Sequence, residues 1–438
     1  MTIVKQFSKY VSLNILAMLG ISCYILADTF FISAAQGADG LTALNLVLPV
    51  YSIIFAIGSM LGTGAATRFA ILRAKGDSSA ERYFANAVEF AVIFGAVFML
   101  IGGFFPQQVV SLFGGDPHIT EVGADYTQVF MLFAPFFMLN HICTAFVRND
   151  GAPAIAMTAT IVSSLSNVLL DYVFMFPLGM GMTGAALATG ISPIISISVC
   201  CIHFFSKRNS VRLCVAVPSL RLLGASCQLG ASAFVGEISS GVTTTVFNFI
   251  ILAIAGNVGV AAYGVVANFA IVGTAVFNGI AQGTQPLVSK AYGEADKSGL
   301  RKIMLLAMSC AALLALLVIS VVMLFAEQCV SLFNSENSVQ LAEYAVTGMR
   351  LYFMGFIFAG FNIVGTGYLG AAEQAAASFA AAISRGFAAI IGFAFLLSAM
   401  FGFTGVWLAF PAAEVFTLFI TVAGLIICNK RMCRHEAE

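Results

Sequence analysis

Asn167 and Asp171 place an amide and a carboxylate four residues apart inside the largely apolar stretch Asn167–Gly190. On a helix, residues four apart lie about 40° apart around the axis and about one turn along it, so these side chains share a face. A carboxylate near mid-bilayer costs at least about 2.5–3.5 kcal/mol and is kept where it meets a proton, an ion or a polar partner. The pair is therefore a candidate cation or proton site. The alternative is an interhelical hydrogen bond that only holds helices together.

Two further polar side chains extend this candidate site, Asp28 in "ILADTFFIS" and Thr189 in "GAALATG". If the first, fifth and sixth apolar spans meet, two carboxylates, an amide and a hydroxyl surround one point. Oxygen ligands of this kind suit a hard cation. Two nearby carboxylates also repel, and a proton bound to either one relieves that repulsion. The residues therefore leave both Na⁺ and H⁺ open as the bound ion.

The whole chain has the composition of a membrane protein. Its 438 residues are 60% hydrophobic and 9% charged, against about 45–50% and about 25% in soluble domains. Apolar runs of about 20 residues, the length that crosses the hydrocarbon core as a helix, recur along the chain. The first run carries Asp28 and no small-residue cleavage site, so we expect a retained helix and not a signal peptide. We predict an all-α integral membrane protein with twelve spans, roughly at 11–33, 43–68, 84–105, 124–147, 154–176, 184–206, 226–254, 260–288, 302–325, 342–368, 376–399 and 404–428.

The connections between these spans alternate in charge. One set, together with the two ends of the chain, carries the basic residues Lys5, Lys9, Arg73, Lys75, Arg82, Arg148, Lys207, Arg208, Arg212, Arg221, Lys290, Lys297, Arg301, Lys302, Arg385, Lys430, Arg431 and Arg434. The other set carries no Lys or Arg. Because basic loops stay on the cytoplasmic side, we expect both termini in the cytoplasm. The short loops and tails favour a prokaryotic protein of the cytoplasmic membrane.

A repeat recurs at an interval of about 220 residues. "FFPQQVVSLF" at Phe104–Phe113 matches "LFAEQCVSLF" at Leu324–Phe333, and "RAKGD" at Arg73–Asp77 matches "KAYGE" at Lys290–Glu294. We therefore predict an N-terminal lobe at 1–205, a cytoplasmic linker at 206–224 and a C-terminal lobe at 225–438. Since each lobe holds an even number of spans, the lobes should be related by an axis along the membrane normal, around a central cleft.

Five stretches together resemble the multidrug and toxic compound extrusion (MATE) transporters, and the likeness covers essentially the whole chain in order. They are "DTFFISAAQGADGLTALNLVLPV", "GTGAATRFAILRAKGD", "RNDGAPAIAMTATIVSSLSNVLLDYVFMF", "GMTGAALATGIS" and "NGIAQGTQPLVSKAYGEAD". The resemblance implies a two-lobe secondary transporter that exports organic, often cationic and lipophilic, compounds in exchange for inward Na⁺ or H⁺. Family members with an ion site in the first lobe build it from positions that match Asp28, Asn167, Asp171 and Thr189.

Other intramembrane charges are open to more than one interpretation. Glu237 in "AFVGEISSGV" is a candidate second-lobe coupling or substrate-binding acid by the same resemblance. We expect Glu89 and Glu414 to be partners of buried basic residues. Besides the basic residues named above, the chain has Arg68, near a cytoplasmic helix end, and Arg350, which should pair with an acid across the bundle and have a structural role.

Several other function classes fit the sequence less well. A lipid or lipid-linked saccharide flippase of related design is the nearest alternative, but it would need basic residues in its groove. A channel would need a continuous polar pore, and no HExxH, GxSxG or Walker motif indicates an enzyme. The ten cysteines show no metal-ligand spacing, so we expect no cofactor besides the coupling ion. The expected partners are lipophilic organic substrates and membrane lipids, without nucleic acid, and we expect a monomer.

Overall fold

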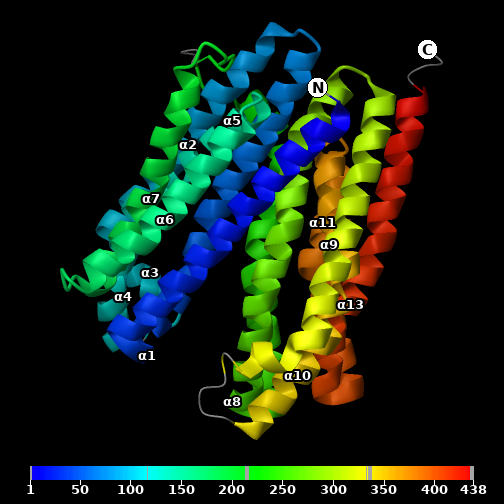
Figure 1. Ribbon diagram of the computed structural model, residues 1–438. Coiled ribbons are helices and arrows are strands. Elements are labelled where there is room, and N and C mark those ends of the chain that lie inside the picture. Colours follow the sequence, from blue (N-terminus) through cyan, green and yellow to red (C-terminus); the bar gives the residue numbers. More distant parts are fainter. Residues whose placement is uncertain (1, 116, 213–216, 332, 334–337, 435–438) are drawn as a thin grey trace. The chain divides into compact units, whose positions relative to one another are not determined.

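Figure 1 shows the computed structural model of the chain, in which residues 2–115, 117–212, 217–331, 333 and 338–434 are described. Within these residues the fold is all-helical. Its helices are long and apolar, as expected for a multi-pass membrane protein. The start of α1 and the end of α13 lie at the same end of the compact unit that holds both of them (Figure 1). This arrangement requires an even number of crossings.

The first six spans come from seven helices and one 3₁₀ turn. They are α1 (Ile3–Ala74), η1 (Ser78–Ala80), α2 (Glu81–Phe104), α3 (Pro106–Leu112), α4 (Pro117–Leu132), α5 (Ala134–Asn149), α6 (Pro153–Met175) and α7 (Gly181–Phe204). α1 contains two spans, because Gly37 interrupts it with φ 63° and ψ −148°. α4 and α5 meet at a bend of 46° and together form one span.

The last six spans repeat this pattern. They come from α8 (Leu220–Gly293), α9 (Lys297–Ser331), α10 (Val339–Phe353), α11 (Phe356–Ala371), α12 (Ala375–Ile383), the π-helical segment η2 (Ser384–Ala388) and α13 (Ala389–Arg434). α8 breaks into two spans at Gly256 and α13 breaks at Gly402. α10 and α11 meet at 48° and form one span. The described residues thus hold the twelve predicted spans, and the predicted fold class is confirmed.

The chain forms two compact units, one of Leu16–Glu237 and the other of Met1–Ile15 with Ile238–Glu438. The Leu16–Glu237 unit has a core rich in phenylalanine, including Phe69, Phe130 and Phe146. The core of the other unit includes the buried Trp407, whose ring packs near those of Tyr263 of α8 and Phe403 of α13. Both unit boundaries fall inside continuous helices, α1 and α8. The lobe boundaries that we drew at residues 205 and 225 therefore stay a prediction.

Glycine brings helix backbones into direct contact in both units. In the Leu16–Glu237 unit, a Cβ atom on Gly64 would lie 1.9 Å from the Ser226 carbonyl oxygen, and one on Gly230 would lie 2.0 Å from that of Met60. In the other unit, a Cβ atom on Gly283 would lie 2.8 Å from the carbonyl oxygen of Tyr10. Small residues permit such close approach between membrane helices. The second span of α1 therefore packs tightly on the start of α8, and the second span of α8 on the start of α1.

The backbone confirms the repeat and corrects one part of its register. Phe105 and Phe325 leave helical geometry in the same way, with φ/ψ of −131°/36° and −118°/20°. In the turns that follow α1 and α8, the residues with positive φ are Gly76 and Ala295. Our alignment of "RAKGD" with "KAYGE" was wrong by two residues, because it matched Gly76 to a glycine by type. The turn is defined by its left-handed residue, which is alanine in the second repeat.

Arg385 is the second correction. We counted it with the basic connections, but it lies in η2, between α12 and α13, about 15 Å along the helix from the start of α12 at about 1.5 Å per residue. The sequence did not indicate this position, because the acid that neutralises Arg385 is distant in the chain. Arg385 Nε lies 2.6 Å from Glu414 Oε1. A base that is paired in this way is tolerated within a membrane helix.

Candidate functional site

The four predicted ion-site residues come from three helices of the Leu16–Glu237 unit. Asn167 and Asp171 lie on α6, Thr189 on α7 and Asp28 on the first span of α1. Asn167, Asp171 and Thr189 are 1%, 0% and 4% exposed, and Asp28 is partly buried. The Asn167 Nδ2 atom lies 3.5 Å from Thr189 Oγ1. The carboxylates of Asp28 and Asp171 are close enough to interact electrostatically. The structure therefore brings all four residues into one neighbourhood.

Four of the oxygen atoms in this group have no hydrogen-bond partner among the described residues. Asp28 Oδ1, Asn167 Oδ1 and both carboxylate oxygens of Asp171 are buried and accept no hydrogen bond from any described residue. Burying such atoms unpaired costs several kcal/mol. Four unsatisfied acceptors from three side chains suit a bound cation, or protons on the carboxylates. The group, which we call the acid site, therefore has the chemistry of an ion-binding site.

Three tyrosines that were not among the predicted site residues adjoin the acid site. The hydroxyl oxygens of Tyr24 and Tyr51 lie 3.4 Å apart. Tyr126 forms a side-chain hydrogen bond with Thr189, and all three tyrosines interact electrostatically with Asp28. The only available signal was that Tyr24 lies four residues before Asp28 and hence on the same helix face. Tyr51 also stacks on Phe55 with ring centroids 4.1 Å apart, so an aromatic cluster borders the acid site.

The second repeat has aromatic rings where the first has site residues. Asp28 lies nine residues before Gly37, and Phe247 lies nine before Gly256. Thr189 lies eight residues after Gly181, and Phe410 lies eight after Gly402. These glycines all have positive φ, and both phenylalanines are buried. The acid site thus has no counterpart of the same chemistry at these positions.

Glu237 lies on α8, at the edge of the same unit as the acid site. It is partly buried, and it interacts electrostatically with Tyr24. Tyr24 therefore has both Asp28 and Glu237 as charged neighbours. The structure places this acid near the aromatic border of the acid site.

The other intramembrane charges differ in their partners. Arg350 Nη2 lies 3.4 Å from Glu327 Oε1, so the expected acid partner exists, although both side chains are exposed. Glu414 has the basic partner that we expected, Arg385. Glu89 does not have one among the described residues, and its Oε2 atom is buried without a hydrogen bond.

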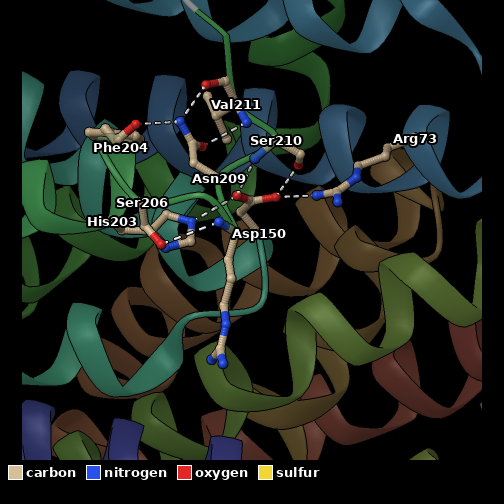
Figure 2. A network of polar contacts seen from close by, with 9 residues as sticks. Arg73, Asp150, His203, Phe204, Ser206, Asn209, Ser210 and Val211 are labelled. Atoms are coloured by element: carbon tan, nitrogen blue, oxygen red, sulfur yellow. Dashed lines mark hydrogen bonds and ion pairs between the residues drawn. The ribbon is translucent and has the colours of Figure 1, made fainter.

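Figure 2 shows a separate polar network, which holds the segment after α7 against the ends of α1, α5 and α7. Asp150, whose side chain is 0% exposed, accepts hydrogen bonds from Arg73 and from the Ser210 hydroxyl. Its Oδ2 atom lies 2.7 Å from His203 Nε2 and 2.9 Å from the Ser210 backbone nitrogen. We call these four residues the Asp150 latch. The described part of the predicted linker is therefore bound to the Leu16–Glu237 unit and is not a free tether.

A resident metal centre is not indicated. The described residues hold no group of three or more His, Cys, Asp or Glu side chains that could bind a metal ion. The acid site, with two carboxylates, an amide and a hydroxyl, suits an exchangeable ion.

Several multidrug export proteins are similar to the chain over nearly its whole length. The multidrug export protein MepA of Staphylococcus aureus (strain NCTC 8325 / PS 47) is 26% identical over 418 residues, which are 95% of this chain and 92% of that protein. MepA of strain MRSA252 is 28% identical over 420 residues, with the same coverage. MepA of Staphylococcus saprophyticus is 24% identical over 423 residues.

Solved structures show the same fold. One, described as the outward-facing conformation of a multidrug resistance MATE family transporter of the MOP superfamily, superposes with a TM-score of 0.91 at 22% identity, over 100% of this chain and 98% of that one. Another, a MOP superfamily transporter from Pyrococcus furiosus described as having a binding pocket of reverse polarity, has a TM-score of 0.88 at 22% identity, over 99% and 96%. The sequence model of the MatE family matches residues 14–173 and 233–392, one segment in each repeat. The resemblance is thus confirmed, and the chain belongs to the MatE family, which consists of transporters and not of enzymes.

Proposed function

We propose that this protein is an antiporter of the cell membrane that exports lipophilic organic compounds in exchange for inward Na⁺ or H⁺. The observation that carries the proposal is the set of four buried oxygen atoms of Asp28, Asn167 and Asp171 that accept no hydrogen bond from the described part of the chain. A membrane protein keeps such groups where they bind an ion or a proton. Relatives named multidrug export proteins, aligned over 95% of this chain, support organic compounds as the exported substrates.

The surroundings of the acid site favour cationic substrates. Acidic side chains and aromatic ring faces both attract organic cations. Tyr24 and Tyr51 supply ring faces beside Asp28, and Glu237 adds a carboxylate near Tyr24. We propose Glu237 as the acid that attracts the substrate cation. Asp28 and Asp171 would bind the coupling ion with Asn167 and Thr189.

The mechanism that we propose is alternating access of the two lobes. An ion from outside binds between Asp28 and Asp171 and removes the repulsion between their carboxylates. This changes the packing of α1, α6 and α7, weakens substrate binding, and lets the substrate leave outward. The ion is then released into the cytoplasm, where a new substrate binds. Coupling requires that ion and substrate bind one state at each other's expense, because a ligand with equal affinity for both states shifts nothing.

The test is uptake of a fluorescent lipophilic cation into inverted vesicles that contain the purified protein, under an imposed Na⁺ or pH gradient. We expect uptake under one of the gradients and its loss in Asp28→Asn and Asp171→Asn. Uptake that needs no gradient, or that both variants retain, would contradict antiport through the acid site. Translocation of a labelled lipid without uptake of the cation would support the flippase alternative.

A second experiment tests the orientation. Tags placed at either end of the chain should resist protease added outside intact cells, because we propose that both termini are cytoplasmic. Digestion of either tag would overturn this topology. The same preparation, analysed in mild detergent by light scattering, tests the monomer that we propose.

A further inference from the structure

A buried polar cluster lies in the unit of Met1–Ile15 and Ile238–Glu438, far along the chain from the acid site. It joins Asn362 of α11, Arg385 of η2 and Glu414 of α13. Arg385 Nε donates to Glu414 Oε1 at 2.6 Å, and Asn362 Nδ2 donates to Glu414 Oε2 at 2.8 Å. Asn362 and Glu414 are 0% and 1% exposed. Three helical elements therefore meet at one carboxylate inside the membrane-spanning region.

The internal hydrogen bonds of the cluster engage both carboxylate oxygens of Glu414 and both ends of the Asn362 amide. Asn362 Nδ2 also lies 2.8 Å from the backbone oxygen of Glu414, and its Oδ1 accepts from Thr421 Oγ1 at 2.9 Å. Each carboxylate oxygen of Glu414 thus has a donor, and the amide of Asn362 uses both of its ends. Glu414 is therefore fixed in place by its neighbours, and it fixes the Nε side of Arg385.

Arg385 keeps donors that no described residue uses. A guanidinium group has five N–H donors, and four of them are on its two terminal nitrogens. Among the described residues, the only hydrogen bond or ion pair of Arg385 is the one that its Nε makes to Glu414. The Arg385 side chain is 26% exposed. The terminal nitrogens therefore receive no acceptor from the residues that the structure describes.

The depth of Arg385 in the membrane limits the surroundings that its terminal nitrogens can have. Arg385 lies about 15 Å along the helix from Ala375, roughly the middle of a hydrocarbon core about 30 Å thick. Charged side chains at this depth face the bundle interior or a water-filled cavity, because exposure to lipid tails is too costly. At this depth an interior or water-filled position is therefore the one that suits the exposed part of the Arg385 side chain.

The local backbone is adapted to hold this side chain. Arg385 is the second residue of the π-helical segment Ser384–Ala388, and such bulges are rare and frequent at functional sites. Ser384 Oγ lies 2.9 Å from Thr417 Oγ1 of α13, which anchors the segment. Tyr352 interacts electrostatically with both Arg385 and Glu414 and stacks on Phe410 with centroids 4.1 Å apart. The guanidinium group therefore lies near the packed aromatic core of this unit, in which Tyr352 and Phe410 are buried.

We propose that the terminal nitrogens of Arg385 bind the carboxylate of exported organic compounds that carry one, so that zwitterionic substrates have a site of their own. A planar guanidinium matches a carboxylate with two parallel hydrogen bonds, and Glu414 holds it in the orientation for this contact. This inference deepens the proposed export of organic compounds and rests on it.

The test uses two fluorescent xanthene dyes that differ only in one group, a free benzoate carboxylate or its methyl ester. Binding of each dye to the purified protein is measured by fluorescence anisotropy, so the result does not depend on transport. The variant is the double substitution Arg385→Gln with Glu414→Gln, which removes both charges and leaves no buried carboxylate without a partner. We expect about tenfold weaker binding of the acid dye, the scale of one charge-assisted contact, and unchanged binding of the ester.

Two further variants complete the experiment. Arg385→Lys keeps the charge but loses the planar fork, and we expect it to restore only part of the binding of the acid dye. Arg431→Gln, which removes an exposed arginine of the same unit that contacts Gln374 at 3.1 Å, should change neither dye. Equal losses for acid and ester, or an unchanged affinity for the acid in the double variant, would overturn the proposal. Failure of gradient-driven transport in the wild-type protein, with the acid-selective loss of binding intact, would instead contradict the antiport function.

Discussion

The Asn167 side chain donates toward Thr189 across the α6–α7 contact, with 3.5 Å between Asn167 Nδ2 and Thr189 Oγ1. This orientation leaves Asn167 Oδ1 as an acceptor that no described residue uses, on the helix face that also carries Asp171. An amide that is held at its nitrogen in this way presents an oxygen ligand without the need to reorganise. The acid site is therefore preorganised for an ion by a neutral contact between two helices.

This contact predicts graded effects of substitution. Asp28→Asn and Asp171→Asn should each abolish ion-driven export, since either change removes a charged ligand. Thr189→Ala should weaken the apparent affinity for the ion about tenfold, the scale of one lost positioning contact, with maximal export rate retained. The measurement is the ion dependence of dye uptake in vesicles. Equal effects of Thr189→Ala and Asp171→Asn would show that Thr189 does more than orient Asn167.

The Asp150 latch should control how accessible the segment after α7 is. Asp150→Ala leaves His203, whose side chain is 3% exposed, without its carboxylate partner. We expect a loss of about 1–3 kcal/mol of stability, the usual cost of an unsatisfied buried group, and faster trypsin cleavage at Lys207 and Arg208 in detergent solution. Arg73→Gln should have a smaller effect because that side chain is 46% exposed. If cleavage in Asp150→Ala is as slow as in the wild-type protein, other contacts hold the segment.

Ala295 offers a stabilising substitution. Its φ of 55° is in the left-handed region, which costs a residue with a Cβ atom roughly 1–2 kcal/mol. Ala295→Gly should therefore raise the stability by about 1 kcal/mol, after the entropy cost of glycine is subtracted. Gly76→Ala, the matched change in the first repeat, where φ is 75°, should lower the stability by a similar amount. Thermal unfolding midpoints measured in one detergent decide the sign of each effect.

Asp77 should give a pH-dependent contribution at the start of η1. Hydrogen bonds from Ser79, including one from its backbone nitrogen at 2.8 Å, lower the pKa of the exposed Asp77 carboxyl group below its usual value of 3.8. Because the folded-state pKa is lowered, this contribution is present in full above pH 3.8 and is lost as the pH falls through the folded-state pKa. The difference in unfolding midpoint between the wild-type protein and Asp77→Ala should therefore shrink below that pH. Asp77→Asn, which keeps the capping oxygen without a titrating group, should not show the change.

The sequence predicted the spans well because hydropathy determines them. The span predicted at 154–176 is α6 at Pro153–Met175, for example. The sharp corners were harder, because the sign of φ cannot be read from residue type. The chain has 41 glycines, and only some of them, such as Gly37 and Gly256, take a left-handed conformation in the described residues. Ala295 shows that the same turn can form without glycine.

The candidate site was predictable to the extent that its residues are unusual in a membrane. Asp28 and Asp171 stand out as acids among apolar neighbours, so the sequence revealed them. Tyr51 and Tyr126 did not stand out, because tyrosine is common in apolar helices and only the fold brings these two near Asp28. Arg385 was misplaced for a related reason: its partner Glu414 belongs to another helix, and sequence does not show which helices meet.

The corners at Gly37, Gly256 and Gly402 have a practical consequence for anyone who wishes to detect or capture this protein. At each of them the chain passes from one span to the next around a single glycine, within a helix that is otherwise continuous. An antibody needs a protruding epitope, and these corners offer almost none. Affinity reagents and inserted labels should therefore be directed to residues 205–212, which follow α7 and lie outside helices.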